Sequence, residues 1–216
     1  MSETSRPIGC VIMASGLARR FGSNKLLADF GGRPLLCRAL DATDTPQLAC
    51  RIVVTRSAEV ETLCQTLGVA CLRHALPGRN DTVRLGLEAL LTLQPGLAGC
   101  IFLPGDQPLL RRETVEALVC AFGSGTRTQK ETERAIFRLA FQAENDPEPL
   151  VGSPVLFERG YFSELCALPE GKGGNVLLKK YPEHVHTVYI ADRNELADAD
   201  TPEALAKLEA LARRNG

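Results

Sequence analysis

The sequence predicts a three-layer α/β/α fold with a mixed, mostly parallel central sheet. Through the first half of the chain, apolar segments of strand length alternate with segments of helical spacing. Parallel strands need long crossover connections, so this alternation predicts helices on both faces of the sheet. Two consecutive strand patterns between positions 134 and 157 are joined by an acidic loop, and they predict an antiparallel addition.

The expected elements follow in a regular order. Apolar spacing of i, i+3, i+4 and i+7 predicts helices that end at Gly68 and at Gly123, and similar spacing over 83–90 predicts another. The last helix opens at Thr201-Pro202, a capping residue followed by proline at the first helical position. Strands are expected at 8–13, 51–55, 69–72, 100–103, 135–141, 153–157 and 185–190.

Length, charge and cysteine content exclude several classes of protein. The 216 residues predict one domain over 1–216, since a domain averages about 150 residues. With 25 Lys and Arg against 26 Asp and Glu, no excess positive charge is present to hold a nucleic acid. No apolar segment approaches the ~20 residues needed to cross a membrane. The eight scattered cysteines contain no Cys-x-x-Cys pair, so they predict reduced thiols in a cytoplasmic protein rather than a metal cluster.

The first strand leads into a small-residue loop with two basic side chains. Ala14, Ser15 and Gly16 are small, so backbone N–H groups there can approach a phosphate closely. Arg20 and Lys25 add positive charge to the same loop. The loop is neither a Walker A motif nor a Gly-x-Gly-x-x-Gly fingerprint. The alternative is an ordinary turn with solvated basic residues.

Acidic residues follow two of the expected strands. Asp106 comes directly after the fourth strand, and the carboxyl ends of such strands face the ligand crevice of an open α/β sheet. A carboxylate there can hold Mg²⁺ against phosphates, and Asp198, after the last strand, offers a second ligand. The alternative role is helix capping, by Asp106 for the next helix and by Asp200 or Thr201 for the last one. Whether Asp198 or Asp200 is the second ligand stays open.

The segment 13–25 carries a resemblance to a known family. It reads Met-Ala-Ser-Gly-Leu-Ala-Arg-Arg-Phe-Gly-Ser-Asn-Lys and resembles the Leu-Ala-Ala-Gly-x-Ser-x-Arg-Phe-Gly-x-x-Lys signature of the MobA-like nucleotidyltransferases. Segments 81–84, 105–108, 152–154 and 198–202 also resemble that family, so the similarity extends over nearly the whole chain. Ser15, Ala18 and Ser153 stand where alanine, serine and histidine are usual, and segment 171–175 lacks the usual acidic residue.

The resemblance implies a Rossmann-like nucleotidyltransferase fold and, within the family, a molybdenum cofactor cytidylyltransferase. Such an enzyme moves CMP from CTP to the terminal phosphate of molybdenum-molybdopterin and releases pyrophosphate, with Mg²⁺ as cofactor. A molybdenum hydroxylase is the implied recipient of the product. The acceptor phosphate is largely dianionic at neutral pH, because its second pKa is near ~6, so no general base is required.

The same resemblance implies a role for individual residues in transfer, metal binding, nucleotide binding and acceptor binding. Segment 76–79 lacks the Gly-Pro-Leu-Ala-Gly of guanylyl-specific relatives, which favours CTP, with Thr82 expected to line the base pocket. The implied residues are Arg20, Lys25 and Asp106 for catalysis, Asp106 and Asp198 for the metal, Ala14, Ser15, Gly16, Arg20, Lys25, Gly78, Thr82 and Asp106 for the nucleotide, and Gln107, Ser153, Gly174 and Asn175 for the acceptor.

Three other functions compete with this one. A nucleotidyltransferase for a sugar or polyol phosphate, or one that uses GTP, would keep the phosphate loop and differ in its acceptor or base pocket. A non-catalytic carrier of the molybdenum cofactor would not need a pyrophosphate site. The presence together of Arg20, Lys25, Asp106 and Asp198 counts against it. A dehydrogenase would need the glycine fingerprint that the sequence lacks.

Overall fold

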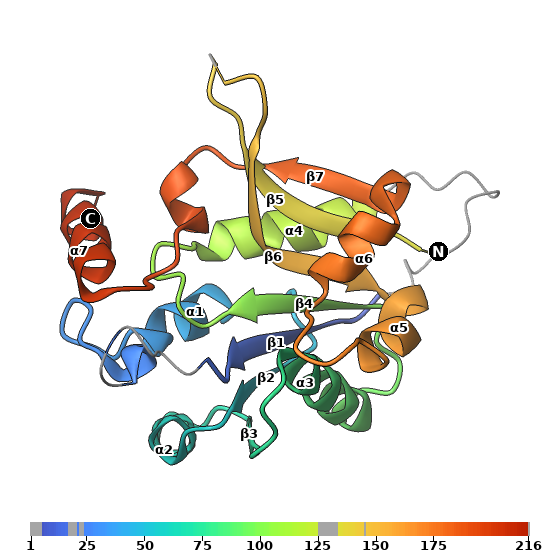
Figure 1. Ribbon diagram of the computed structural model, residues 1–216, viewed down its shortest axis with the longest axis horizontal. Helices are drawn as coiled ribbons and strands as arrows, with labels where there is room; N and C mark the ends of the chain where they lie inside the picture. The colour runs from blue at the N-terminus through green and yellow to red at the C-terminus, as the bar shows by residue number, and fades with distance from the viewer. Residues whose placement is uncertain (1–5, 17–20, 22–23, 125–133, 145, 216) are drawn as a thin grey trace.

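The computed structural model describes residues 6–16, 21, 24–124, 134–144 and 146–215, and its strands form one seven-stranded sheet in the order β3-β2-β1-β4-β6-β5-β7 (Figure 1). All seven expected strands are present, with bounds that differ from the expected ones by up to three residues. The strands are β1 (Ile8–Ala14), β2 (Cys50–Thr55), β3 (Cys71–Arg73), β4 (Gly99–Pro104), β5 (Ile136–Phe141), β6 (Leu150–Glu158) and β7 (Val185–Tyr189).

The sheet is mixed and mostly parallel, as predicted. β1 pairs in parallel with β2 and β4, β2 with β3, and β5 with β7. β6 runs antiparallel to β4 and β5, which confirms the antiparallel addition. Because β6 runs antiparallel to its neighbour β4, the first residues of β6 lie at the same edge of the sheet as the carboxyl ends of β1 and β4.

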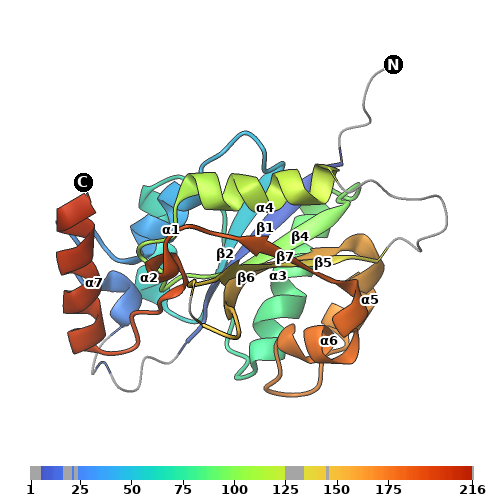
Figure 2. The ribbon, with the colours of Figure 1, turned by 90° about the horizontal axis from the view of Figure 1, so that it is seen from above.

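Helices cover both faces of the sheet, as Figure 2 shows with α4 on one side and α3, α5 and α6 on the other. Alternate side chains of β1 pack on opposite faces of the sheet. Ile12 belongs to the core cluster with α1, α2 and α4, and Val11 belongs to the cluster with α3, α5 and α6. This is the buried, two-sided environment that parallel strands require. The helices are α1 (Leu36–Ala42), α2 (Ala58–Thr66), α3 (Arg79–Leu93), α4 (Arg112–Ser124), α5 (Phe162–Cys166), α6 (Asn175–Lys180) and α7 (Pro202–Asn215).

Helix α7 packs beside the sheet rather than on it. Its Leu205 and Leu208 form a separate apolar cluster with Phe30 and Leu35, which precede α1 (Figure 1). Thr201 caps the helix, since its Oγ1 accepts a hydrogen bond from the N–H of Ala204 at 3.1 Å. The cluster fixes the segment before α7 against the segment before α1.

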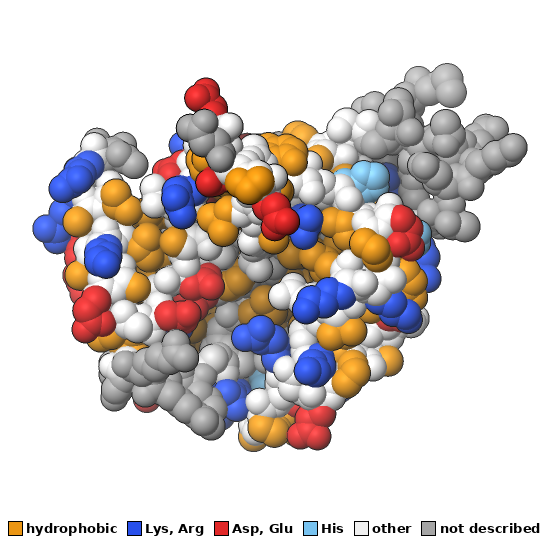
Figure 3. Space-filling view, turned by 45° about the horizontal axis from the view of Figure 1, so that its top comes forward, with side chains coloured by type: hydrophobic (Ala, Val, Ile, Leu, Met, Phe, Trp, Pro, Cys, Tyr) orange, Lys and Arg blue, Asp and Glu red, His pale blue; other side chains and the backbone are white. Residues whose placement is uncertain are grey.

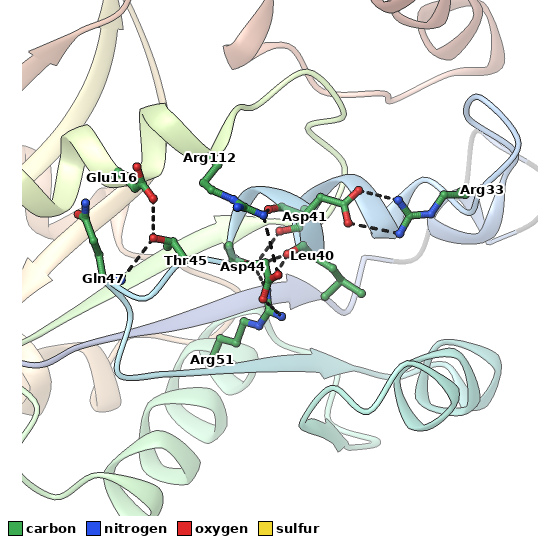
Figure 4. Close-up of polar contacts among 11 residues, drawn as sticks. Arg33, Leu40, Asp41, Asp44, Thr45, Gln47, Arg51, Arg112 and Glu116 are labelled. Atoms are coloured by element: carbon green, nitrogen blue, oxygen red, sulfur yellow. Dashed lines mark hydrogen bonds and ion pairs between the residues drawn. The ribbon is translucent and has the colours of Figure 1, made fainter.

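Polar contacts tie α1 to β2 and α4 (Figure 4). Arg51 on β2 donates to the carbonyl of Leu40 at 2.7 Å and to Asp44 at 2.8 Å, so a cation lies at the carboxyl end of α1, where the helix dipole favours one. Thr45 donates to Glu116 of α4 at 2.6 Å. These contacts hold the helix that follows the segment carrying Lys25.

All eight cysteines lie in the described part of the chain and are free thiols, as expected. Within the described ranges, none of the helices combines the length and the apolar character that crossing a membrane requires.

Candidate active site

The switch point of the sheet lies between β1 and β4. From β1 the chain adds β2 and β3 on one side, and it then returns to add β4 on the other side. In open α/β sheets, ligands bind outside the carboxyl ends of the two strands at such a point. The N–H of Gly105, just after β4, donates to the carbonyl of Met13 at 3.0 Å, so the two strand ends stay joined here.

Lys25 lies between two carboxylates at this point. Its Nζ is 2.5 Å from Asp106 and 2.8 Å from Asp200. Lys25 begins the 3₁₀ helix η1 (Lys25–Leu27), whose Leu26 is buried in the core and whose first turn is capped by Asn24. The sequence Asn24-Lys25-Leu26 therefore anchors the backbone and presents the ammonium to the switch point. Arg20, the other expected basic residue, lies outside the described residues.

The second acidic segment is brought to Asp106 by a backbone contact. The N–H of Ala199 donates to the carbonyl of Asp106 at 2.9 Å, which places Asp198 and Asp200 beside the end of β4. Because Thr201 caps α7, the alternative role of Asp200 as that cap does not apply. Asp200 instead binds Lys25.

Glu195 locks this segment in place. It belongs to the 3₁₀ helix η4 (Arg193–Leu196) and is buried, and it accepts hydrogen bonds from the N–H and the guanidinium of Arg111 and from the hydroxyl of Thr114. Glu195 thus accepts the hydrogen bonds at the amino end of α4, and Asp106 does not cap that helix. The same contact joins the segment that carries Asp198 to the loop that carries Asp106.

The crowded charges shift two pKa values. Desolvation would lower the pKa of Lys25, but the hydrogen bonds and charges of Asp106 and Asp200 outweigh it, so that pKa is raised. Although Asp198 keeps exposed surface, partial desolvation and then the Asp106 carboxylate raise the pKa of Asp198 to about 6. The carboxylates of Asp106, Asp198 and Asp200 thus lie near one described ammonium, that of Lys25. Their negative charge exceeds the single positive charge, and this excess suits a divalent cation.

Replacing Asp198 with asparagine is expected to stabilise the protein near neutral pH. An acid with a higher pKa in the folded than in the unfolded chain costs stability where it is ionised in the folded state. For Asp198 the cost is absent below the ordinary aspartate pKa of 3.8, grows up to about pH 6 and is complete above it. In thermal unfolding, Asp198→Asn should have a higher Tm than wild type at about pH 7 to 8 and the same Tm as wild type near about pH 4. A variant that is no more stable than wild type at the higher pH would contradict the raised pKa.

The described residues of the loop after β1 leave room at Gly16. A Cβ built on Gly16 would meet no atom of a described residue within 4 Å. Ala14 is buried, and its carbonyl accepts a hydrogen bond from Thr55 at 3.0 Å. The carbonyl of Ser15 accepts two hydrogen bonds from Arg56, at 2.9 Å and 2.6 Å. The backbone of this loop is therefore fixed before any ligand binds.

The hydroxyl of Ser15 is used inside the protein. It lies 3.1 Å from the carbonyl of Val54 and 3.0 Å from Nε2 of His74, which is in turn 3.4 Å from the hydroxyl of Thr82. Desolvation and the charge of Arg56 lower the pKa of His74, so this ring is neutral at pH 7. Thr82 is only 3% exposed, so its side chain does not line an open base pocket as expected. Helix packing buries it beneath the first turn of α3, where it supports His74.

Gly78 lies at the amino end of α3, where two polar side chains fold back over it. A Cβ there would come within 2.1 Å of Oδ1 of Asn80, so that side chain would have to move, and the Gly78 N–H donates to Asp81 at 3.0 Å. Gly174 is also a packing residue, because its Cβ would lie 2.8 Å from the Phe157 ring. The N–H of Gly171 donates to Asn80 at 2.9 Å, so segment 171–175 borders the start of α3.

The expected acceptor residues occupy different environments. Gln107 is buried and lies 3.5 Å from the carbonyl of Leu196, so it supports the segment of Asp198 rather than an open pocket. Asn175 is exposed at the start of α6. Ser153 lies in a β-bulge of β6, at the edge of the sheet that also carries Asp106, since β6 runs antiparallel to β4.

Two residues of this site were not expected from the sequence. Arg56 bridges the carbonyls of Ser15 and Pro77, the latter at 3.5 Å, and Glu195 holds the amino end of α4. Arg56 follows β2 directly, and a charged residue just past a central strand is a signal that could have identified it. Glu195 has no comparable signal, because its partners lie 84 and 81 positions away in the sequence.

Comparison with known proteins adds a family to this geometry. A model of the MobA-like NTP transferase domain matches residues 10–186. The bifunctional protein GlmU of Anaeromyxobacter sp. (strain K) is 35% identical over 130 residues, which cover 56% of this chain and 26% of that protein. This chain therefore spans about a quarter of the length of that relative.

Two other curated relatives cover more of their own length. The 3-deoxy-manno-octulosonate cytidylyltransferase of Anaeromyxobacter sp. (strain Fw109-5) is 26% identical over 95% of this chain and 97% of its own. The probable molybdenum cofactor guanylyltransferase of Pyrococcus horikoshii is 25% identical over 54% of this chain and 57% of its own.

Solved structures share the fold. Rv0371c from Mycobacterium tuberculosis H37Rv has a TM-score of 0.77 at 21% identity and covers 94% of this chain and 98% of its own. A manganese complex of Rv0371c has a TM-score of 0.71 at 20% identity, with the same coverage of the two chains. CMP:2-keto-3-deoxy-manno-octonic acid synthetase, complexed with CTP, has a TM-score of 0.74 at 17% identity and covers 97% and 99%. The expected Rossmann-like nucleotidyltransferase fold is confirmed, and the family match over residues 10–186 makes this chain a member of the MobA-like NTP transferase domain family.

Proposed function

We propose that the protein transfers CMP from CTP to the terminal phosphate of molybdenum-molybdopterin. One observation carries the proposal: Lys25 lies between Asp106 and Asp200 at the switch point, beside a loop whose described residues leave room at Gly16. A fixed ammonium next to an open backbone loop suits a bound triphosphate. An oxygen of the acceptor phosphate attacks the α-phosphorus of CTP, the bond between the α-phosphorus and the bridging oxygen breaks, and pyrophosphate leaves with that electron pair.

The reaction needs no general base. The acceptor phosphate is already largely dianionic at neutral pH, since its second pKa is near ~6. His74, the histidine nearest the loop, is neutral and contacts Ser15, so it supports the loop rather than abstracting a proton. Catalysis then depends on alignment and charge neutralisation, with Lys25 and Arg20 assigned to the triphosphate.

A divalent metal fits the carboxylates of the site. Asp106 and Asp198 would hold Mg²⁺, which would neutralise phosphate charge during transfer. Among the described side chains, no group of three or more His, Cys, Asp or Glu residues forms a complete metal site. The proposed Mg²⁺ would take its other ligands from phosphate and water, since Mg²⁺ commonly binds only one or two protein carboxylates. The manganese complex of Rv0371c supports the same assignment.

The acceptor is the least constrained part of the proposal. Molybdenum-molybdopterin rests on the sequence resemblance and on the P. horikoshii relative, and a molybdenum hydroxylase is the proposed recipient of the product. Eight free thiols fit the reducing cytoplasm in which we place the protein. A sugar phosphate is the second candidate acceptor, because the octulosonate cytidylyltransferase aligns with 95% of this chain. Lys25 and Asp106 together favour transfer over a non-catalytic carrier role.

We expect CTP to exceed GTP by at least about tenfold in kcat/KM. The chain lacks, at 76–79, the Gly-Pro-Leu-Ala-Gly segment of guanylyl-specific relatives, and this favours the smaller base. A site that pairs the edge of cytosine leaves polar groups unmatched by guanine, which costs ~1 to 3 kcal/mol for each buried group. Steady-state rates with the two nucleotides at matched Mg²⁺ measure the ratio. Equal or better use of GTP would place the protein with the guanylyltransferases.

One experiment tests the whole proposal. Pyrophosphate release is measured with each of the four nucleotides against molybdenum-molybdopterin and a panel of sugar phosphates, with Asp106→Asn as the inactive control. The proposal predicts release with CTP and molybdenum-molybdopterin. Release with a sugar phosphate alone would favour the second candidate, and no release with any pair would contradict the proposed activity.

A further inference from the structure

The guanidinium of Arg56 joins two loops that come from distant parts of the chain. Its Nε and Nη2 donate to the carbonyl of Ser15, in the loop after β1, at 2.9 Å and 2.6 Å. Its Nη1 donates to the carbonyl of Pro77, in the loop before α3, at 3.5 Å. Arg56 follows β2, which lies between β1 and β3 in the sheet, so its side chain reaches both loops. The bridge holds the backbones of these loops at one separation.

The partners of Arg56 differ from those of the arginines before and after it in the sequence. Arg51 pairs with the carboxylate of Asp44, and Arg73 pairs with that of Glu61. Such pairs join two side chains, which can each rotate away from the other. The carbonyls that Arg56 binds belong to the backbone instead, so each of its hydrogen bonds restrains the path of a loop.

A second connection joins the same two segments. The hydroxyl of Ser15 lies 3.0 Å from Nε2 of His74, and that nitrogen lies 3.4 Å from the hydroxyl of Thr82 on α3. The two connections therefore both start at Ser15 and reach the chain on either side of Gly78, at Pro77 and at Thr82. Together they hold the amino end of α3 to the loop after β1 at two points.

The proposed nucleotide would extend across the two loops. In the proposed function its phosphates lie at Lys25 and the loop after β1, and its base lies beside Gly78 at the start of α3. The face of the molecule drawn in Figure 3 is hollowed, with acidic side chains on one side of the hollow and basic ones on the other. A ligand that contacts two separate loops binds more tightly when the loops are already at the right separation, because ordering them on binding costs free energy.

We infer that Arg56 is a positioning residue for the nucleotide, which sets the loop after β1 and the loop before α3 at the separation that a nucleoside triphosphate needs. The inference rests on the proposed function. Arg56 acts through the carbonyls of Ser15 and Pro77, to which its hydrogen bonds go. A ligand that contacts both loops therefore depends on Arg56, whereas pyrophosphate, which would contact only the phosphate end of the site, does not.

The test uses two variants of Arg56 and one matched control. Arg56→Met keeps the apolar stem and removes the donors and the charge. Arg56→Lys keeps the charge, but a single nitrogen cannot replace the guanidinium fork that joins the loops. The control is Arg159→Met, because Arg159 also bridges two backbone carbonyls, those of Pro95 at 2.9 Å and Leu97 at 2.7 Å. These carbonyls precede β4 and so lie at the edge of the sheet opposite to the site.

Isothermal titration in Mg²⁺, without an acceptor, measures the affinity of each protein for CTP and for pyrophosphate, and thermal unfolding confirms that each variant folds. Arg56→Met should weaken CTP binding by about tenfold or more and leave pyrophosphate binding within about twofold of wild type. Arg56→Lys should show a smaller loss for CTP and again none for pyrophosphate. Arg159→Met should bind both ligands like wild type, so that a loss of stability alone does not explain the effect at Arg56.

Two results would overturn the inference and leave the proposed function standing. The first is CTP affinity in Arg56→Met equal to that of wild type. The second is an equal loss of CTP and pyrophosphate affinity in Arg56→Met with both restored in Arg56→Lys, which would assign Arg56 to direct attraction of the phosphates. If Arg56→Met does not fold, Arg56→Lys decides: wild-type affinity for CTP overturns the inference, and a loss confined to CTP supports it.

Failure of the proposed function gives a different result, because it appears in the wild-type protein. A wild-type protein that binds GTP and not CTP would contradict the proposed base, and the same variants titrated with GTP would then test the role of Arg56. A wild-type protein that binds none of the four nucleotides would overturn both the proposed function and this inference.

Discussion

Replacing Asp106 with asparagine is expected to lower kcat by about 10²- to 10³-fold, because removing one well-placed electrostatic group from an active site typically costs that much. Asp106 contacts Lys25 and lies near Asp198, so the change removes charge where the ammonium is held and where the proposed metal would bind. Asparagine has nearly the same volume, and the backbone contact from Ala199 stays. Folding should therefore be retained while Mg²⁺-dependent pyrophosphate release is lost.

Asp44→Asn is the matched control, because it removes the same charge from an exposed pair with Arg51 outside the site. An exposed pair contributes about 0 to 1 kcal/mol, so this variant should turn over like wild type. Turnover of Asp106→Asn at the wild-type rate would contradict the metal assignment. A comparison of Asp198→Asn with Asp200→Asn then identifies the second ligand: we expect the larger loss for Asp198→Asn, and the reverse order would transfer the role to Asp200.

Replacing Lys25 with methionine is expected to lower kcat/KM for CTP by about 10²-fold. The ammonium is held between two carboxylates at the switch point, where it would meet the phosphates of the proposed nucleotide. A point charge there favours both binding of the triphosphate and departure of pyrophosphate, so KM should rise and kcat should fall. Isothermal titration with CTP and steady-state rates measure the two effects separately.

Lys207→Met on the exposed surface of α7 removes the same charge outside the site and should match wild type. Arg20→Ala is expected to act in the same direction as Lys25→Met. If CTP affinity and rate both stay unchanged in Lys25→Met, the loop after β1 is an ordinary turn and does not bind phosphate.

The architecture could be predicted because its signals are local. Strands and helices are specified within windows of roughly ten to fifteen residues. The apolar run that forms β1 is one such window, and the helical spacings that end at Gly68 and Gly123 are two others. The alternation of these windows then limits the topology, since right-handed crossovers give a parallel sheet. The antiparallel hairpin of β5 and β6 was predicted for the same reason, from two adjacent strand patterns.

The environment of each site residue could not be predicted in the same way. Thr82 and Ser15 have hydroxyls that suit a nucleotide, but both hydroxyls contact His74. Gln107 lies next to Asp106 in the sequence, yet it is buried against the last residue of η4. A side chain's neighbours in space come from several strands at once, and the spacing along one strand carries no information about them.

By itself, the sequence determined that Lys25, Asp106 and Asp198 would share one edge of a mostly parallel sheet, because each follows a recognisable element whose end must lie at that edge. Only the tertiary structure decided that Asp200 binds Lys25 while Thr201 caps α7, and that Glu195 holds the amino end of α4. The physical reason is the range of the interactions. Hydrophobic periodicity and capping act between residues a few positions apart, whereas ion pairs and burial depend on segments up to 175 positions apart that meet only after the sheet has assembled.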